Sequence, residues 1–99
     1  MPDEAYDIDL KDGYIISISL TTVQGKVVRF VVRLTDARGE TKHDLARYDT
    51  AHGWPHLDIL TPTGKVREKH WMPFAELGIA LSRGIEDFKK NHENYSHDH

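Results

Sequence analysis

The sequence predicts an α+β protein: an antiparallel meander sheet of four to five strands with one C-terminal helix packed on one face. Two observations support this class. Apolar and polar residues alternate in short runs between Gly13 and Trp71, with turn residues between the runs, which is typical of half-buried strands. After Trp71 the apolar period changes once, to near 3.6, which is typical of an amphipathic helix. Because one helix covers only one face of a sheet, we expect the other face to meet water.

The predicted elements follow one another along a single domain, residues 13–90. Before it, residues 1–12 form an acidic N-terminal segment whose alternating apolar residues can add an edge strand. Strands are expected at residues 14–22, 27–34, 44–49, 56–61 and 66–71, with glycine-containing turns between them. The turn at Gln24-Gly25 joins the first two strands as a hairpin, since glycine adopts positive φ without strain.

The C-terminal helix is expected from Pro73 onward and should run for four to five turns. Gly78 and Gly84 each weaken a helix by about 1 kcal/mol relative to alanine, so we expect close packing against the sheet to explain them. Residues 91–99 have no apolar period and are predicted to form a disordered tail.

These elements define a predicted core and a predicted open face. The predicted core is Ile16, Ile18, Val28, Phe30, Val32, Tyr48, Leu57, Ile59, Phe74, Leu77, Leu81 and Phe88. The opposite face is expected to present Ser17, Ser19, Arg29, Arg33, Arg47, Asp49, His56 and Asp58. Ile15, Val27 and Val31 also point that way, and an apolar stripe on an exposed face predicts a protein partner or a homodimer that covers it.

Composition limits the function further. The chain has 99 residues, no cysteine and a formal net charge of −3. This length supports a modest core rather than a large enclosed cavity, and the lack of cysteine excludes disulfides, thiolate metal sites and cysteine nucleophiles. The negative charge gives no global attraction to nucleic acid, and the sequence contains neither a membrane span nor a basic leader. We therefore expect a cytoplasmic protein with no membrane association and no cofactor.

Residues 47–60 form the part of the chain that folding alone does not obviously demand. They are predicted to form a tight β-hairpin in which Asp49 faces His56 and Arg47 faces Asp58, so that one face of the hairpin is polar and the other is apolar. The candidate site is this polar face with the loop above it: Arg47, Asp49, His52, His56 and Asp58.

Three interpretations of this site stay open. Two imidazoles, carboxylates that orient them and a guanidinium suit proton transfer on a phosphate ester without metal. His52, His56 and Asp58 or Asp49 are also donors that suit zinc, nickel or iron, although their spacing matches no established metal motif. The third interpretation is structural: cross-strand charge pairs that fix the hairpin register, each worth a few tenths of a kcal/mol.

The motif R-Y-D-x-A-H-G-x-x-H-x-D-[IL]-L, carried here by residues 47–60, resembles a family of small prokaryotic proteins without an assigned activity. The match extends over about residues 44–90 and implies the hairpin followed by a C-terminal helix. More distantly, the R-Y-D and spaced-histidine pattern is similar to TumE-type toxins of toxin–antitoxin pairs. Those toxins have a denser histidine cluster after the hairpin, where this sequence has His70.

Two functional hypotheses follow. The first is an interaction module of a toxin–antitoxin-like system that uses the polar sheet face around the hairpin. The alternative is a compact metal-independent ribonuclease in which His52 and His56 act as base and acid, Asp49 or Asp58 orients an imidazole, and Arg47 binds the phosphate. RNA is then a second kind of partner. The sequence does not decide whether the protein is an enzyme.

Overall fold

The structure, a computed structural model, describes residues 3–51, 53–72 and 76–97. Six strands form one antiparallel sheet in chain order: β1 (Asp3–Asp9), β2 (Tyr14–Val23), β3 (Lys26–Asp36), β4 (His43–Asp49), β5 (His56–Leu60) and β6 (Val66–Trp71). They are followed by α1 (Leu77–Asn91) and a 3₁₀ helix, η1 (His92–Tyr95). The α+β class and the meander are confirmed. The expected count of four to five strands is wrong, because residues 3–9 pair with β2 along their whole length.

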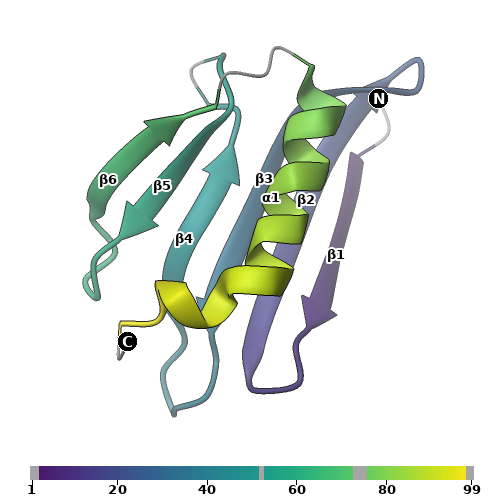
Figure 1. Ribbon diagram of the computed structural model, residues 1–99. Helices are drawn as coiled ribbons and strands as arrows, with labels where there is room; N and C mark the ends of the chain where they lie inside the picture. The colour runs from purple at the N-terminus through teal and green to yellow at the C-terminus, as the bar shows by residue number, and fades with distance from the viewer. Residues whose placement is uncertain (1–2, 52, 73–75, 98–99) are drawn as a thin grey trace.

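The α1 helix lies across one face of the sheet, over β2 and β3, and leaves the other face uncovered by any element that the structure describes (Figure 1). We call this second face the open face. Glu76 caps α1, since its carboxylate accepts hydrogen bonds from the backbone N–H groups of Gly78 and Ile79. Pro73 and Phe74, where the helix was expected to begin, lie outside the described residues. The described part of the chain contains no helix that is long and apolar enough to cross a membrane.

The core lies between α1 and the sheet. Predicted core residues that are buried are Ile16, Ile18, Phe30, Val32, Tyr48, Leu81 and Phe88. Leu57 and Leu77 are half-buried against them, and Ile59 is half-buried. Phe74 is outside the described residues. The core also includes residues that the sequence prediction left out: Tyr14, Leu20, Leu34, Leu45, Ala46, Leu60 and Ala80.

Val28 is the one predicted core residue that the structure places at the surface, with 44% of its area exposed. The cause is a bulge: Thr21 pairs with Arg29 but Thr22 pairs with Val27, so Val28 is an extra residue in β3. This extra residue reverses the alternation, and Val27 packs against the core instead of pointing from the open face. The turn before it was predicted correctly, with Gln24 and Gly25 both at positive φ.

Tyr48 joins β4 to the helix layer. Its ring lies 5.0 Å from that of Phe88, and its hydroxyl donates a 2.6 Å hydrogen bond to Asp87 of α1. Tyr95 of η1 and the Asn91 side chain donate to the same carboxylate, so Asp87 connects the sheet, α1 and η1. Burial and these bonds to Asp87 raise the pKa of both tyrosines above the ordinary value of 10.

The sequence predicts a disordered tail over residues 91–99, of which the structure describes residues 91–97 in contact with the rest of the molecule. Tyr95 packs edge-on against Phe88, and the His97 ring lies 3.1 Å from the Leu60 carbonyl oxygen. His92 Nε2 lies 2.9 Å from an Asp12 carboxylate oxygen, which connects the end of α1 to the turn between β1 and β2. The tail therefore closes one end of the helix layer.

The Asp12–His92 pair makes stability depend on pH. Burial of the His92 ring opposes its charge, but the hydrogen bond and the negative charge of Asp12 outweigh this, and the pKa of His92 is raised above 6.5. The same hydrogen bond lowers the pKa of Asp12. The His92 contribution is fully present below about pH 6.5, the unfolded-state value, and is lost as pH rises through the folded-state pKa.

We therefore expect the free energy of unfolding in urea to fall more between about pH 6 and 8.5 in the parent than in His92→Gln. An NMR titration should give His92 a pKa above the ordinary histidine value of 6.5. Parallel pH profiles for the parent and His92→Gln would contradict the pairing.

Candidate functional site

Two neighbouring rows of residues cross the open face through all six strands. From β1 to β6 the first row is Asp7, Ser17, Arg33, Arg47, Asp58 and Lys69, each paired with the next. The second row, from Ala5 and Ser19, continues through Val31, Asp49, His56 and Trp71. The predicted pairs Arg47–Asp58 and Asp49–His56 are confirmed. Where the rows cross β4, β5 and β6 they bring charged residues together.

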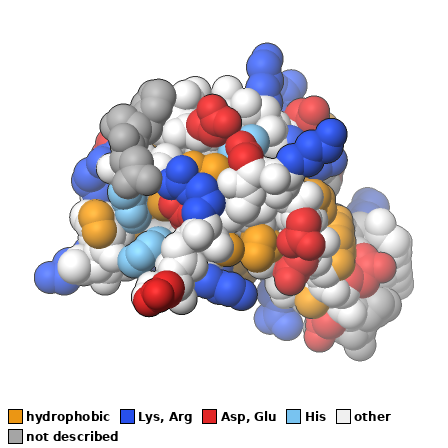
Figure 2. Space-filling model, turned by 90° about the horizontal axis from the view of Figure 1, so that it is seen from below, with side chains coloured by type: hydrophobic (Ala, Val, Ile, Leu, Met, Phe, Trp, Pro, Cys, Tyr) orange, Lys and Arg blue, Asp and Glu red, His pale blue; other side chains and the backbone are white. Residues whose placement is uncertain are grey.

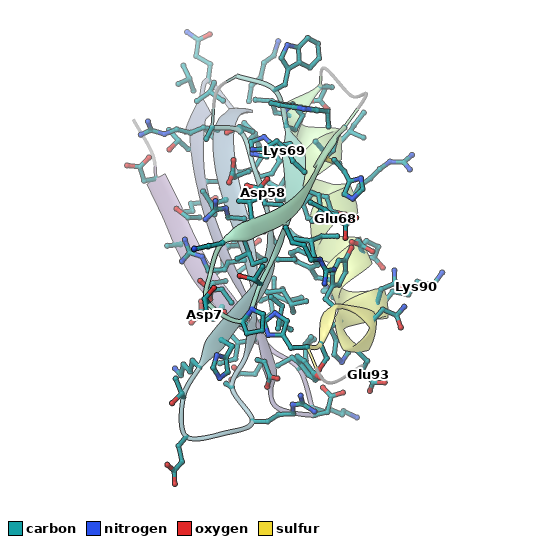
Figure 3. All side chains as sticks on the ribbon, turned by 90° about the vertical axis from the view of Figure 1, so that its left-hand side faces the viewer. Asp7, Asp58, Glu68, Lys69, Lys90 and Glu93 are labelled. Atoms are coloured by element: carbon teal, nitrogen blue, oxygen red, sulfur yellow. The ribbon has the colours of Figure 1, made fainter. Side chains whose placement is uncertain are left out.

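We call this group the charge cluster: Arg47, Asp49, His56, Asp58 and Lys69. Asp58 lies at its centre, with Lys69 Nζ 3.1 Å from its Oδ1 and Arg47 Nη2 3.3 Å from its Oδ2. Figure 3 shows Asp58 and Lys69 close together, with Glu68 on the side of β6 that faces α1. Arg47 Nε also lies 3.2 Å from Asp49 Oδ2. Both carboxylates are thus neutralised by cationic side chains that are about one third exposed.

His56 lies between the two carboxylates. Its Nε2 is 3.0 Å from Asp49 Oδ1 and 3.5 Å from Asp58 Oδ2, while its Nδ1 is 3.0 Å from the Trp54 carbonyl oxygen. A carbonyl oxygen only accepts, so Nδ1 carries a proton and donates. Nε2 then faces carboxylate oxygens, which also accept, and a neutral ring has no second proton to offer them. A proton or another cation is needed among these atoms.

The burial of the cluster differs from the sequence prediction. Asp49, His56 and Asp58 were expected on a solvent-exposed face, but their exposed fractions are 6%, 1% and 1%. The Trp71 ring lies tilted against the His56 ring, with 4.9 Å between the ring centroids, and Arg47 and Lys69 reach over the carboxylates. These side chains shield the charges, so the cluster is a buried network rather than a set of exposed cross-strand pairs.

The structure brings together four of the five predicted site residues: Arg47, Asp49, His56 and Asp58. His52, the fifth, lies outside the described residues. Lys69 and Trp71 were not predicted as site residues. The alternation of β6 could have found them, because placing Asp58 opposite Lys69 puts Trp71 opposite His56.

The open face beside the cluster is shallow and accessible. Two hollows on it share Ser19 and Val31; one extends to Arg29 and Thr50, the other to Ser17 and Arg33. On the end of the molecule seen in Figure 2, acidic and basic side chains are interspersed. The two hollows and the partly exposed Arg47 and Lys69 side chains give a partner access to the edge of the charge cluster from the open face.

The fold and cluster define a small α+β protein with a six-stranded meander, one covering helix and a buried His–Asp network on the uncovered sheet face. The chain belongs to the family described as a domain of unknown function, DUF7718, whose model matches residues 1–99. Comparison with curated proteins and with solved structures found no match.

Proposed function

We propose that the protein is an interaction module that binds an acidic segment of a protein partner on its open face. The observation that carries this proposal is the direct pairing of Arg33 with Arg47 across β3 and β4. Like charges at directly opposite positions destabilise a sheet, so folding alone does not account for them. Arg47 is held by Asp49 and Asp58, whereas the Arg33 side chain is 46% exposed and lies 3.6 Å from Asp44. A partner carboxylate at Arg33 would relieve the repulsion.

The neighbouring surface suits an extended peptide. Arg29 and Arg33 are four residues apart on β3, about 13 Å along the strand, with the half-buried Val31 between them. Ser17 and Ser19 of β2 supply hydroxyl groups along the same line. An extended segment with an apolar residue at its centre and an acidic residue two positions to either side would therefore match Arg29, Val31 and Arg33 along β3.

The distant resemblance to TumE-type toxins supports a partner that is produced with this protein, as in a toxin–antitoxin pair in the cytoplasm. The ribonuclease alternative has weaker support. General acid–base catalysis needs an imidazole within reach of the substrate, and His56 is 1% exposed, with Nδ1 at the Trp54 carbonyl and Nε2 between the carboxylates. This geometry favours binding over catalysis.

The proposal is tested by using the tagged full chain to capture partners from a lysate of the cells that produce it. The proteins recovered by the parent, by Arg33→Glu and by Lys90→Glu are compared. Lys90 lies on the exposed side of α1, so Lys90→Glu changes the net charge equally and leaves the open face intact. We expect the parent and Lys90→Glu to recover the same partner protein, and Arg33→Glu to recover at least tenfold less of it. Arg33→Glu should still fold, because it replaces the repulsion at Arg47 by attraction, and the pair it loses with Asp44 is about half exposed and contributes little. Equal recovery by all three proteins, or recovery of RNA instead of protein, would overturn the proposal.

The sequence also predicts that a second copy of this chain covers the open face, which would make a homodimer. Of the three apolar residues predicted there, Val27 is turned toward the core, and Ile15 and Val31 remain. Light scattering at high micromolar concentration tests the predicted homodimer. A dimer that persists unchanged in Val31→Glu would not use this face.

A further inference from the structure

We infer that Asp49, His56 and Asp58 form a binding site for one divalent transition-metal ion of the zinc class. Each residue directs one donor atom to a common point: Asp49 Oδ1, His56 Nε2 and Asp58 Oδ2. One donor atom from each of the three lies within 4.8 Å of the others. The inference concerns the chemistry of the cluster and is independent of the partner proposed for the open face.

The spacing of these atoms fits a tetrahedral metal centre. Bonds of about 2.0 Å place the ligand atoms of tetrahedral zinc roughly 3.3 Å apart. The distances from His56 Nε2, 3.0 Å to Asp49 Oδ1 and 3.5 Å to Asp58 Oδ2, lie on either side of this value. These two distances therefore need to change by only a few tenths of an ångström, and the donor atoms of the two carboxylates lie within 4.8 Å of each other. Three protein ligands leave a fourth position for water or another small ligand.

The outer contacts of the three residues are those of metal ligands. His56 donates its other ring nitrogen to the Trp54 carbonyl, which fixes the tautomer that leaves Nε2 free to bind metal. Asp49 Oδ2 is held by Arg47, and Asp58 Oδ1 lies 3.1 Å from Lys69. Asp49 and His56 thus each keep one polar atom for the centre and have the other anchored by a second residue, whereas Asp58 Oδ2 would share the metal ion with a 3.3 Å hydrogen bond from Arg47 Nε.

Two features indicate that a cation belongs at this point. His56 Nε2 faces two acceptor groups in a site that is almost fully buried, and a metal ion satisfies all three at once. Asp58 Oδ2 accepts a hydrogen bond from Arg47, but the buried Oδ1, although near Lys69, accepts none, so the Asp58 carboxylate has bonding capacity left. Because Arg47 and Lys69 add positive charge nearby, we expect micromolar rather than nanomolar affinity.

Isothermal titration of the metal-free full chain with ZnCl₂ tests the inference, with Co²⁺ absorption as a second readout. We expect one equivalent to bind and to raise the melting temperature. Asp49→Asn and Asp58→Asn should weaken Zn²⁺ binding at least tenfold, since loss of a residue that only supports a ligand already costs about that much, and should remove the tetrahedral Co²⁺ spectrum. His70→Gln and His92→Gln are the matched controls, since these histidines lie outside the site, and both should bind like the parent.

A second measurement needs no variant at the cluster. Nitrogen NMR of the parent should show the His56 Nε2 resonance shifting on Zn²⁺ addition while the His70 ring is unchanged. Absence of binding to the parent would overturn the inference. Binding that survives both Asp variants, or that is lost in His92→Gln, would also overturn it, since the latter places the metal with Asp12, His92 and Glu93.

Discussion

Replacing Asp58 by alanine is expected to lower the free energy of unfolding by about 3 kcal/mol. Asp58 is buried beneath two cationic side chains and lies beside His56. Removing one member of a buried charge network leaves the others uncompensated and opens a cavity, and each effect is destabilising. Urea denaturation followed by circular dichroism measures the loss. An exposed cross-strand pair would instead be worth a few tenths of a kcal/mol.

Asp7→Ala is the matched control for this prediction. Asp7 lies in the same row of the open face but is exposed on β1, so its replacement should change stability by less than about 0.5 kcal/mol. Similar small losses in both variants would show that the cluster is solvated in solution. Growth or binding phenotypes of alanine variants in the cluster therefore need a stability measurement beside them.

Gly84→Ala is expected to destabilise the protein by about 2 kcal/mol, although alanine is the better helix former by about 1 kcal/mol. A Cβ at this position would lie 2.9 and 3.0 Å from two ring carbons of Tyr48. Tyr48 cannot move aside easily, because its hydroxyl is bonded to Asp87 and its ring packs on Phe88. The overpacking therefore exceeds the gain in helix propensity. Thermal denaturation gives the sign directly.

Gly78→Ala, in the same helix, provides the contrast. A Cβ at Gly78 would meet the Glu76 carboxylate that caps α1, at 3.2 Å, and not the sheet, so the predicted close packing against the sheet is wrong for this glycine. We expect Gly78→Ala to be neutral or stabilising by up to about 1 kcal/mol. If both substitutions stabilise the protein, α1 and Tyr48 of β4 are not in the close contact at Gly84 that the structure shows.

The fold was predictable to the extent that it follows from local periodicity. Alternation located β2 to β6 within two residues, and the single change of period placed the helix after them. Side-chain orientation in β3 was not predictable at Val27 and Val28, since a bulge depends on pairing with β2. The edge strand β1 was uncertain because its sequence is mostly acidic, and its pairing comes from the long β2 beside it.

The site shows the same division. The register of Arg47 with Asp58 and of Asp49 with His56 followed from counting residues on either side of the turn. The burial of these residues depends on Lys69 and Trp71, which approach through a different hairpin. Alternation within β6 gives the face on which Lys69 and Trp71 lie, but their closeness to Asp58 and His56 also requires the register between β5 and β6. Charge pairs of this kind therefore look exposed until the neighbouring strand is placed.

The composition of β1 restricts how copies of this chain can assemble. Four of its seven residues are acidic, and it forms one outer edge of the sheet with its remaining backbone groups unpaired among the described strands. Joining two copies edge to edge through β1 would set four carboxylates against four, in a continuous twelve-stranded sheet. Charged edge strands of this kind resist such growth and the aggregation that follows from it.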